Sequence, residues 1–134
     1  MPLVVLSMSH KFAKSIKFTR KSKEHLFVGN LMSKIFEVAP QALASTEHAV
    51  TADDIEIWPN ILHPMARSKF DISIDIVTAS DQERHANCFE RANQITQELK
   101  KFLGNPYILF CVDIHLDTEG FVASNILFPS SKSS

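Results

Sequence analysis

The chain has 134 residues, a formal net charge of −1, and a composition that is 45% hydrophobic and 22% charged. This length fits one domain, and the composition is that of an ordinary globular protein. A near-neutral charge excludes the strong positive field that binding to nucleic acid or to an anionic membrane usually needs. The sequence has no run of about 18 apolar residues and no export signal, so we expect no membrane span and a cytoplasmic protein.

The two cysteines, Cys88 and Cys111, are far apart in the sequence and do not have the spacing of metal ligands. In a protein without an export signal, they are expected to be reduced thiols in the core. We expect one domain over residues 1–129. A flexible polar tail is expected over residues 130–134, directly after Pro129.

The first half of the chain predicts a strand, a helix and a second strand. Residues 3–6 are apolar and partly β-branched, which indicates the first strand. A helix is expected over residues 22–38, with Ser22 as a candidate N-cap and Pro40 as its stop. Residues 54–58 alternate polar and apolar side chains, which predicts a half-buried strand that ends at Pro59-Asn60.

The second half predicts the same three elements again. Residues 70–76 alternate strictly and indicate the third strand. Thr78 or Ser80 is expected to cap a helix over residues 81–103, which ends at Gly104-Asn105-Pro106. Its apolar residues step by three and four and predict a stripe facing the core: Ala86, Phe89, Ala92, Ile95, Leu99 and Phe102. Residues 107–116 form the last predicted strand, with room for one more small strand after it.

The predicted order is therefore βαβ followed by βαβ. It indicates an α+β fold in which two helices cover one face of a four-stranded sheet. Periodicity alone leaves the order of the strands within that sheet open.

Pro2 stands directly before the first predicted strand. The initiator methionine is normally removed before a small residue such as proline, so Pro2 is expected to carry a free secondary amine. An α-amino group titrates near pH 8 in water, and burial in an apolar pocket lowers its pKa. A neutral amine held by a strand can act as a general base or attack a carbonyl carbon. The alternative is a proline that only begins an edge strand, with a solvated N-terminus.

Pro2 at a strand start, the βαββαβ order and the chain length together resemble the tautomerase superfamily. This superfamily includes 4-oxalocrotonate tautomerase, 5-carboxymethyl-2-hydroxymuconate isomerase and macrophage migration inhibitory factor. The similarity is one of layout over most of the chain and is clearest from Phe70 through the second helix. It implies a catalytic Pro2 that shuttles a proton on a small carbonyl or enol substrate, no cofactor, and a homotrimer whose sheets form a central barrel. The ferredoxin-like sandwich is the second architecture with this order.

The expected substrate-binding residues differ from those of the muconate isomerase, in which arginines near the second strand and after the third bind the substrate carboxylates. Here the matching segments read Asp53-Asp54-Ile55 and Thr78-Ala79-Ser80-Asp81. Acidic side chains would repel a carboxylate by about 1 kcal/mol or more at ~4 Å, so a dicarboxylate substrate is not expected. We take Asp54, Thr78 and Arg84 as candidate substrate-binding residues. Arg84 or the basic segment over residues 11–23 would supply the missing positive charge.

Two further groups of residues are expected to be structural. The basic segment has six Lys and Arg residues in 13 and fits a solvated amphipathic face, although it could bind an anionic ligand. Polar side chains also recur along one side of the third and last strands: Asp71, Ser73, Asp75, Cys111, Asp113, His115 and Asp117. Neighbours on one strand face are almost 7 Å apart, too far to share an ion without a second strand, so no metal site is expected. A polar second sheet face, solvated or in a subunit interface, fits them better.

Two functions follow from these observations. The leading hypothesis is an enzyme in which Pro2 acts as a general base or nucleophile. The competing hypothesis is a non-catalytic binding module of tautomerase-like or ferredoxin-like fold. With three glycines and no phosphate-binding loop, nucleotide chemistry is not expected. Neither nucleic acid nor a membrane is an expected partner.

Overall fold

The computed structural model describes residues 2–17, 23–62, 65, 69–104, 107–116 and 121–127. The expectations for Ser22, the Asn105-Pro106 stop, Asp117 and the tail over residues 130–134 lie outside these residues. The elements are β1 (Leu3–Met8), α1 (His10–Lys17), α2 (Lys23–Leu43), the 3₁₀ turn η1 (Ala52–Asp54), β2 (Glu56–Ile61), β3 (Ile72–Thr78), α3 (Gln82–Ala86), α4 (Cys88–Leu103), β4 (Phe110–Leu116) and β5 (Phe121–Leu127).

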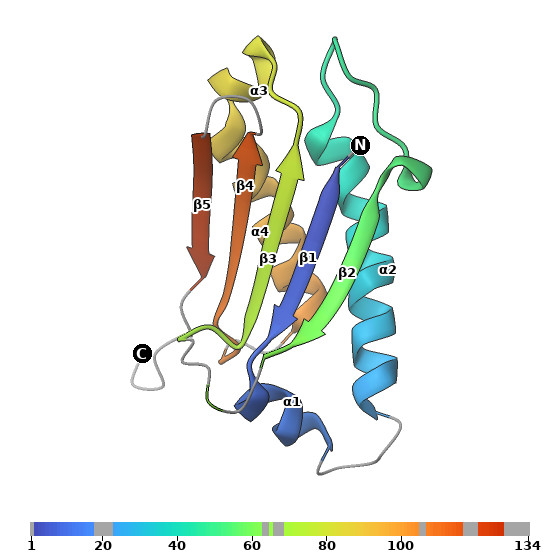
Figure 1. Ribbon diagram of the computed structural model, residues 1–134, viewed down its shortest axis with the longest axis vertical. Coiled ribbons are helices and arrows are strands. Elements are labelled where there is room, and N and C mark those ends of the chain that lie inside the picture. The colour runs from blue at the N-terminus through green and yellow to red at the C-terminus, as the bar shows by residue number, and fades with distance from the viewer. Residues whose placement is uncertain are drawn as a thin grey trace.

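The strands form one mixed sheet in the order β2-β1-β3-β4-β5 (Figure 1). β1 runs parallel to β2 and β3 parallel to β4, while the two central strands, β1 and β3, are antiparallel. β5 pairs with β4 in the antiparallel direction and is the further small strand for which the sequence left room after residue 116. The expected α+β fold is therefore confirmed, and its sheet is mixed. Each βαβ unit keeps its two strands adjacent, whereas the split units of a ferredoxin-like sandwich place another strand between them.

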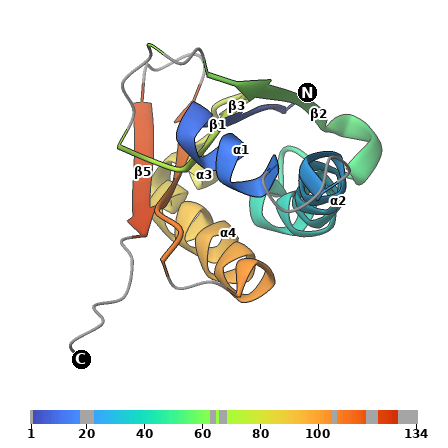
Figure 2. The same ribbon diagram turned by 90° about the horizontal axis from the view of Figure 1, so that it is seen from below.

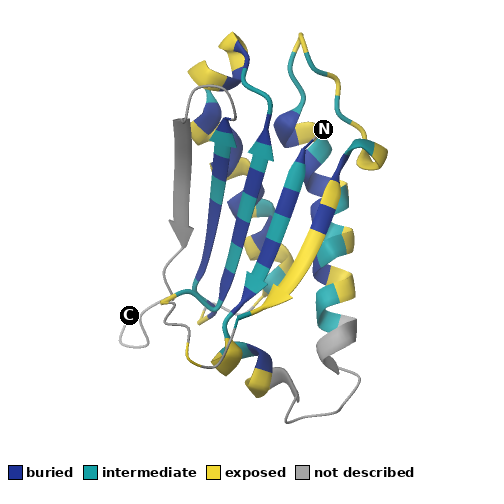
Figure 3. Ribbon diagram, in the orientation of Figure 1, coloured by how far each residue is buried: buried dark blue, intermediate teal, exposed yellow. Residues whose placement is uncertain are grey.

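The two long helices, α2 and α4, lie side by side on one face of the sheet (Figures 1 and 2). Buried and half-buried side chains alternate along β1 and β3 and along most of β4, as Figure 3 shows. The buried set faces the helices and forms the core, which includes Val4, Leu6, Ile74, Ile76, Val112, Ile114, Leu31, Ile35, Ile95 and Leu99. No helix among the described residues has both the length and the apolar character needed to cross a membrane.

Two prolines that were expected to end elements lie inside them. α2 continues through Pro40 to Leu43, and β2 continues through Pro59 to Ile61. β2 is an edge strand. Its Glu56 N–H donates to Pro2 O just before β1, and the Leu62 N–H just after β2 donates to Met8 O. Because neighbouring residues of a strand point their N–H groups to opposite sides, the position of Pro59 faces away from β1 and needs no N–H group.

The predicted helix over residues 81–103 is interrupted. Asn87 (φ −126°, ψ 28°) separates α3 from α4. Asp81 is the N-cap rather than Thr78 or Ser80, since its side chain accepts a hydrogen bond of 2.6 Å from the Arg84 N–H. Ala92, Ile95 and Leu99 of the predicted stripe are buried, whereas Ala86, Phe89 and Phe102 are exposed, Phe89 by 60%. The buried residues of α4 are Cys88, Arg91, Ala92, Ile95, Thr96 and Leu99. Both cysteines are free and buried, as expected.

Candidate active site

Three segments meet at one end of the sheet because of the strand directions. The antiparallel pairing of Leu3 with Val77 places the start of β1 beside the end of β3. The parallel pairing of Leu3 with Glu56 places the start of β2 there as well. Pro2, which precedes β1, therefore lies close to Thr78 at the end of β3 and to Asp54 just before β2.

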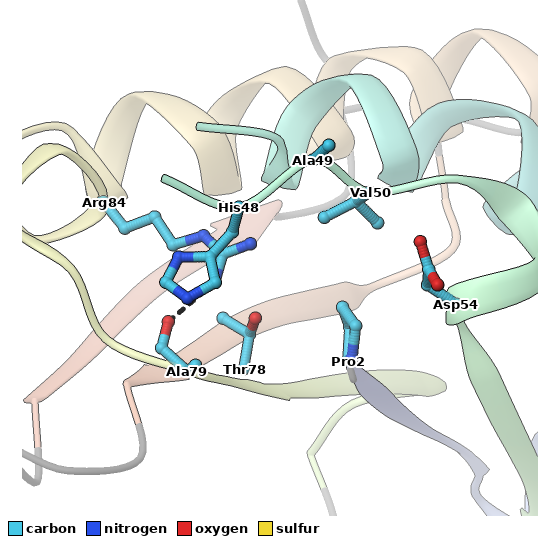
Figure 4. A pocket seen from close by; sticks show the side chains of 8 residues that line it. All are labelled: Pro2, His48, Ala49, Val50, Asp54, Thr78, Ala79 and Arg84. Carbon is cyan, nitrogen blue, oxygen red and sulfur yellow. Dashed lines mark hydrogen bonds between the residues drawn. The ribbon is translucent and has the colours of Figure 1, made fainter. Parts of the chain in front are cut away.

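These segments surround a cavity of about 170 Å³ (Figure 4). It is lined by Pro2, His48, Ala49, Val50, Asp54, Thr78, Ala79 and Arg84. An engineered cavity of roughly 150 Å³ accommodates benzene, so the volume suits a ligand of modest size. All four residues singled out from the sequence, Pro2, Asp54, Thr78 and Arg84, line this one cavity. Their roles in binding and catalysis remain predictions.

Pro2 is buried, and its ring projects from the start of β1 towards the cavity (Figure 4). Its carbonyl oxygen accepts a hydrogen bond of 3.1 Å from the Glu56 N–H, which extends the pairing of β1 with β2 to this residue. The backbone of Pro2 is therefore held by the sheet. This position differs from the alternative of a solvated proline at the margin of an edge strand, because β1 is a central strand.

Thr78 provides a polar group in the same cavity. The residue is 3% exposed, and within the described part of the chain its hydroxyl oxygen has no hydrogen-bond partner. A buried polar group without a partner costs about 1–3 kcal/mol. A ligand that hydrogen-bonds to Thr78 Oγ1 would remove this cost, so the hydroxyl is a natural point for ligand recognition.

Arg84 brings a positive charge to the cavity, but much of its bonding capacity is used within the protein. The residue is 2% exposed. Its Nε donates to Leu43 O at 2.9 Å and its Nη1 to Ala79 O at 2.7 Å. Burial lowers the pKa of Arg84 from its ordinary value, and the charge of Asp81 opposes this shift. A guanidinium has five N–H donors and remains charged in proteins, so at most three donors are left for a ligand.

The two acidic segments occupy different positions. Asp54 is half-buried at the cavity, where its Oδ2 accepts hydrogen bonds from Thr51 N at 2.8 Å and Thr51 Oγ1 at 3.1 Å. Asp81 does not line the cavity. Its buried carboxylate instead accepts hydrogen bonds from Ser45, His48 and Arg84. Only one of the two acidic segments therefore faces a ligand, and the expected repulsion of a carboxylate is reduced to that of Asp54.

His48 is a polar lining residue that the sequence did not single out. It lies in the loop between α2 and η1, and its Nδ1 is 2.7 Å from Asp81 Oδ2. The two residues are 33 positions apart, so no local spacing connects them. The fold topology could have indicated this pair, because the loop after α2 and the loop after β3 both lie at the end of the sheet where β1 begins.

The opposite face of the sheet carries a second polar cluster. Pairing of β3 with β4 places Asp75 beside Asp113, and His115 Nε2 is 3.3 Å from Asp75 Oδ1. The candidate ligand atoms of Asp75, Asp113 and His115 lie within 4.8 Å of one another and could hold a metal ion. Residues on one strand would be too far apart to share an ion, but the pairing of β3 with β4 brings these three side chains close together. A His–Asp ion pair on a polar sheet face accounts for the same contacts.

Comparisons of the chain with protein-family models, with curated proteins and with solved structures give no match. The function is therefore argued from the cavity and its residues.

Proposed function

We propose that the protein is a tautomerase-like enzyme that uses the amine of Pro2 as a general base on a small keto or enol compound. One observation carries this proposal. A proline held by a central strand lines the same cavity as a buried arginine and a buried hydroxyl without a partner. These groups supply a base, a positive charge and a polar contact, which suit proton transfer next to a carbonyl group.

The proposed reaction is a shift of one proton with no net oxidation. After removal of Met1, the lone pair of the Pro2 amine takes a proton from the carbon beside a carbonyl group. The electrons of the broken C–H bond form a C=C bond, and the carbonyl oxygen gains negative charge. Arg84 and Thr78 are placed to stabilise this charge, because both line the cavity that the oxygen would enter. Protonation of the oxygen completes the enol, and the reverse sequence gives the ketone.

The architecture supports the finer assignment to a tautomerase-like fold. The strands of each βαβ unit are adjacent and the two units meet through the antiparallel pair β1 and β3. A split arrangement, as in a ferredoxin-like sandwich, would separate β1 from β2. We further propose a homotrimer, in which the sheet face away from α2 and α4 is turned towards the other subunits.

The cavity restricts the proposed substrate. A volume of about 170 Å³ admits a compound about the size of a benzene ring with short substituents. Asp54 lines the cavity and would repel a second carboxylate placed beside it. We therefore propose a small carbonyl or enol compound with at most one carboxylate, bound near Arg84.

The test is the conversion of phenylpyruvate between its enol and keto forms, followed by ultraviolet absorbance. Intact mass must first show that Met1 has been removed, because a retained Met1 leaves Pro2 without a free amine. Pro2→Ala is expected to lower kcat/KM by about 100-fold or more, the usual contribution of a general base. Pro59→Ala is the matched control, since Pro59 is an exposed residue of the edge strand. Equal rates for wild type and Pro2→Ala would reject the proposal.

A second candidate function is a binding module that holds a small anion without converting it. The observation in its favour is that Arg84 donates to two backbone carbonyls, as a structural arginine does. Binding of phenylpyruvate that is equal in wild type and Pro2→Ala, with no turnover in either protein, would favour this candidate.

A further inference from the structure

We propose that His48, positioned by Asp81, is the second proton-transfer group of the cavity and exchanges a proton with the substrate oxygen while Pro2 exchanges one with carbon. The inference rests on the proposed function and adds a catalytic residue to it. Three features of the structure carry it: the state of Asp81, the fixed position of His48, and the nitrogen of His48 that remains for a ligand.

Asp81 is ionised and acts only as an acceptor. Its side chain is 1% exposed, and burial alone would raise its pKa. Hydrogen bonds from Ser45 Oγ at 2.6 Å, from Arg84 N at 2.6 Å and from His48, together with the charge of Arg84, hold the pKa well below its usual value. A carboxylate has no hydrogen to donate, so the 2.7 Å contact requires that His48 Nδ1 carries the hydrogen.

The position of His48 is set by the loop around it. His48 N donates to Ser45 Oγ at 3.1 Å, and Ser45 N donates to His48 O at 2.8 Å. Ser45 also donates to Asp81, so one hydroxyl links the loop, the histidine and the carboxylate. Asp81 itself is fixed as the N-cap of α3. A side chain held in this way needs little reordering when a substrate binds, which favours catalysis.

Since Nδ1 faces Asp81, Nε2 is the nitrogen of His48 that remains for the cavity. Figure 4 shows His48 and Pro2 on either side of Thr78. The imidazole is 39% exposed, so it can also exchange its proton with water. A carbonyl compound in the cavity would then have Pro2 on one side and His48 on the other.

The proposed step is balanced without any further reactant. The Pro2 amine takes the proton from carbon, the C–H electron pair becomes the C=C bond, and the carbonyl π electrons move to oxygen. The oxygen takes a proton from His48 Nε2, which leaves a neutral imidazole and a protonated Pro2. In the direction from enol to ketone, His48 takes the hydroxyl proton and Pro2 returns one to carbon. Asp81 stays ionised and holds the imidazolium in place.

Several charged groups surround His48 and shape the pH dependence. Asp81 and Arg84 lie on the side of α3, and Glu83 of α3 accepts a hydrogen bond from Thr46 in the loop of His48. Asp54 and the Pro2 amine face it across the cavity. In the proposed step, His48 Nε2 is the group that exchanges a proton with the substrate oxygen. Loss of His48 should therefore change the shape of the pH–rate profile as well as its height.

The experiment compares the pH–rate profiles of wild type, His48→Gln and Pro2→Ala from pH 5 to 9, with phenylpyruvate as the probe. His48→Gln is expected to lower kcat/KM by about 100-fold and to remove one limb of the profile. The control is His10→Gln, an exposed residue of α1 at the opposite end of β1, which should match wild type. A His48→Gln profile with the wild-type shape would overturn the inference, because a purely structural role moves only the height.

The outcomes separate this inference from the proposed function. A full rate in Pro2→Ala rejects the proposed function. A loss of rate in Pro2→Ala, together with a wild-type pH–rate profile in His48→Gln, rejects only the role of His48.

A second measurement does not depend on turnover. The ¹⁵N chemical shifts of the neutral His48 ring should show hydrogen on Nδ1 and a bare Nε2. Hydrogen on Nε2 would overturn the inference whatever the activity.

Discussion

At the scale of single residues, Asp81 links three parts of the chain through one carboxylate. It caps α3, pairs with the buried Arg84, and holds the loop of Ser45 and His48. Its pKa in the folded protein lies below the ordinary value of 3.8. In a pH window at and below that value, the unfolded chain therefore binds more protons than the folded chain does. By linkage, stability rises with pH across this window and is lost as the pH falls.

We predict that the free energy of unfolding of the wild type falls steeply as the pH drops below about 4. Asp81→Asn keeps a capping side chain but removes the charge, so it should be less stable at pH 7 and show a shallower decline between pH 4 and pH 2. Urea denaturation at a series of pH values measures both slopes. Glu47→Gln, an exposed acid in the same loop, is the control and should follow wild type. Equal slopes for Asp81→Asn and wild type would contradict this account.

The candidate site was partly visible in the sequence, for reasons that differ from residue to residue. Pro2 was a candidate because it stands directly before the first predicted strand, and Asp54 and Thr78 because their segments match those that bind substrate in the muconate isomerase. Arg84 followed from its place in the first turn of a helix. His48 was missed, since it becomes a site residue only through a contact with Asp81 between two loops. Periodicity describes faces of single elements and carries no information about such contacts.

At the scale of elements, buried arginines explain why α2 is longer than its sequence predicts. The last carbonyl groups of a helix lack partners within the helix. Here Arg84 donates to Leu43 O, and Arg91 donates to Ala42 O and Ala44 O. These bonds satisfy the end of α2 and offset part of the cost of about 3 kcal/mol that a proline brings to a helix interior.

The same tertiary contacts explain the break at Asn87. The apolar stripe predicted for residues 81–103 leaves Arg91 on the exposed side, because charged side chains are rarely buried. The structure instead turns Arg91 inwards, where its Nε also donates to Asn87 Oδ1 at 2.7 Å. Cys88 and Arg91 join Ala92, Ile95 and Leu99 on the buried face of α4, while Phe89 is exposed.

Replacing either of two glycines by alanine is expected to change the free energy of unfolding, with opposite signs at the two positions. Gly104 ends α4 with φ 63°, a left-handed conformation that alanine adopts only at a cost of about 1 kcal/mol. Gly29 lies within α2, and a Cβ there would meet no atom within 4 Å. Gly104→Ala should therefore lower the free energy of unfolding, and Gly29→Ala should raise it by up to about 1 kcal/mol. Urea denaturation measures both changes. A shared sign would count against Gly29 as an interior residue of α2 or against Gly104 as the C-cap of α4.

At the scale of the whole molecule, the single chain leaves apolar surface at the side and at the edge of its sheet. Leu3, Val5 and Val77 are only half-buried on the face away from the helices. Trp58 and Ile61 of β2 are 58% and 42% exposed. Exposed apolar side chains of this kind can take part in contacts between subunits. It supports the proposed trimer and indicates where the subunits would meet.

Light scattering at micromolar concentration should give three times the mass of the chain. Trp58→Lys, at the exposed edge, is expected to weaken the trimer and to make the mass depend on concentration. Lys100→Ala, on an exposed part of α4, is the control and should keep the trimer. A monomer at all concentrations would argue against the trimer and against the tautomerase-like assembly.

The position of Pro2 has a practical consequence for how the protein is produced. Residues added before Pro2 would extend from the end of the sheet that carries the cavity. A purification tag there would therefore block the amine and crowd the cavity, while the fold stayed intact. Leu127, at the end of β5, pairs with Phe110 and so lies at the opposite end of the sheet from Thr78. A tag attached beyond β5 starts from that far end. On the proposed function, a preparation tagged before Pro2 would keep its fold and lack activity.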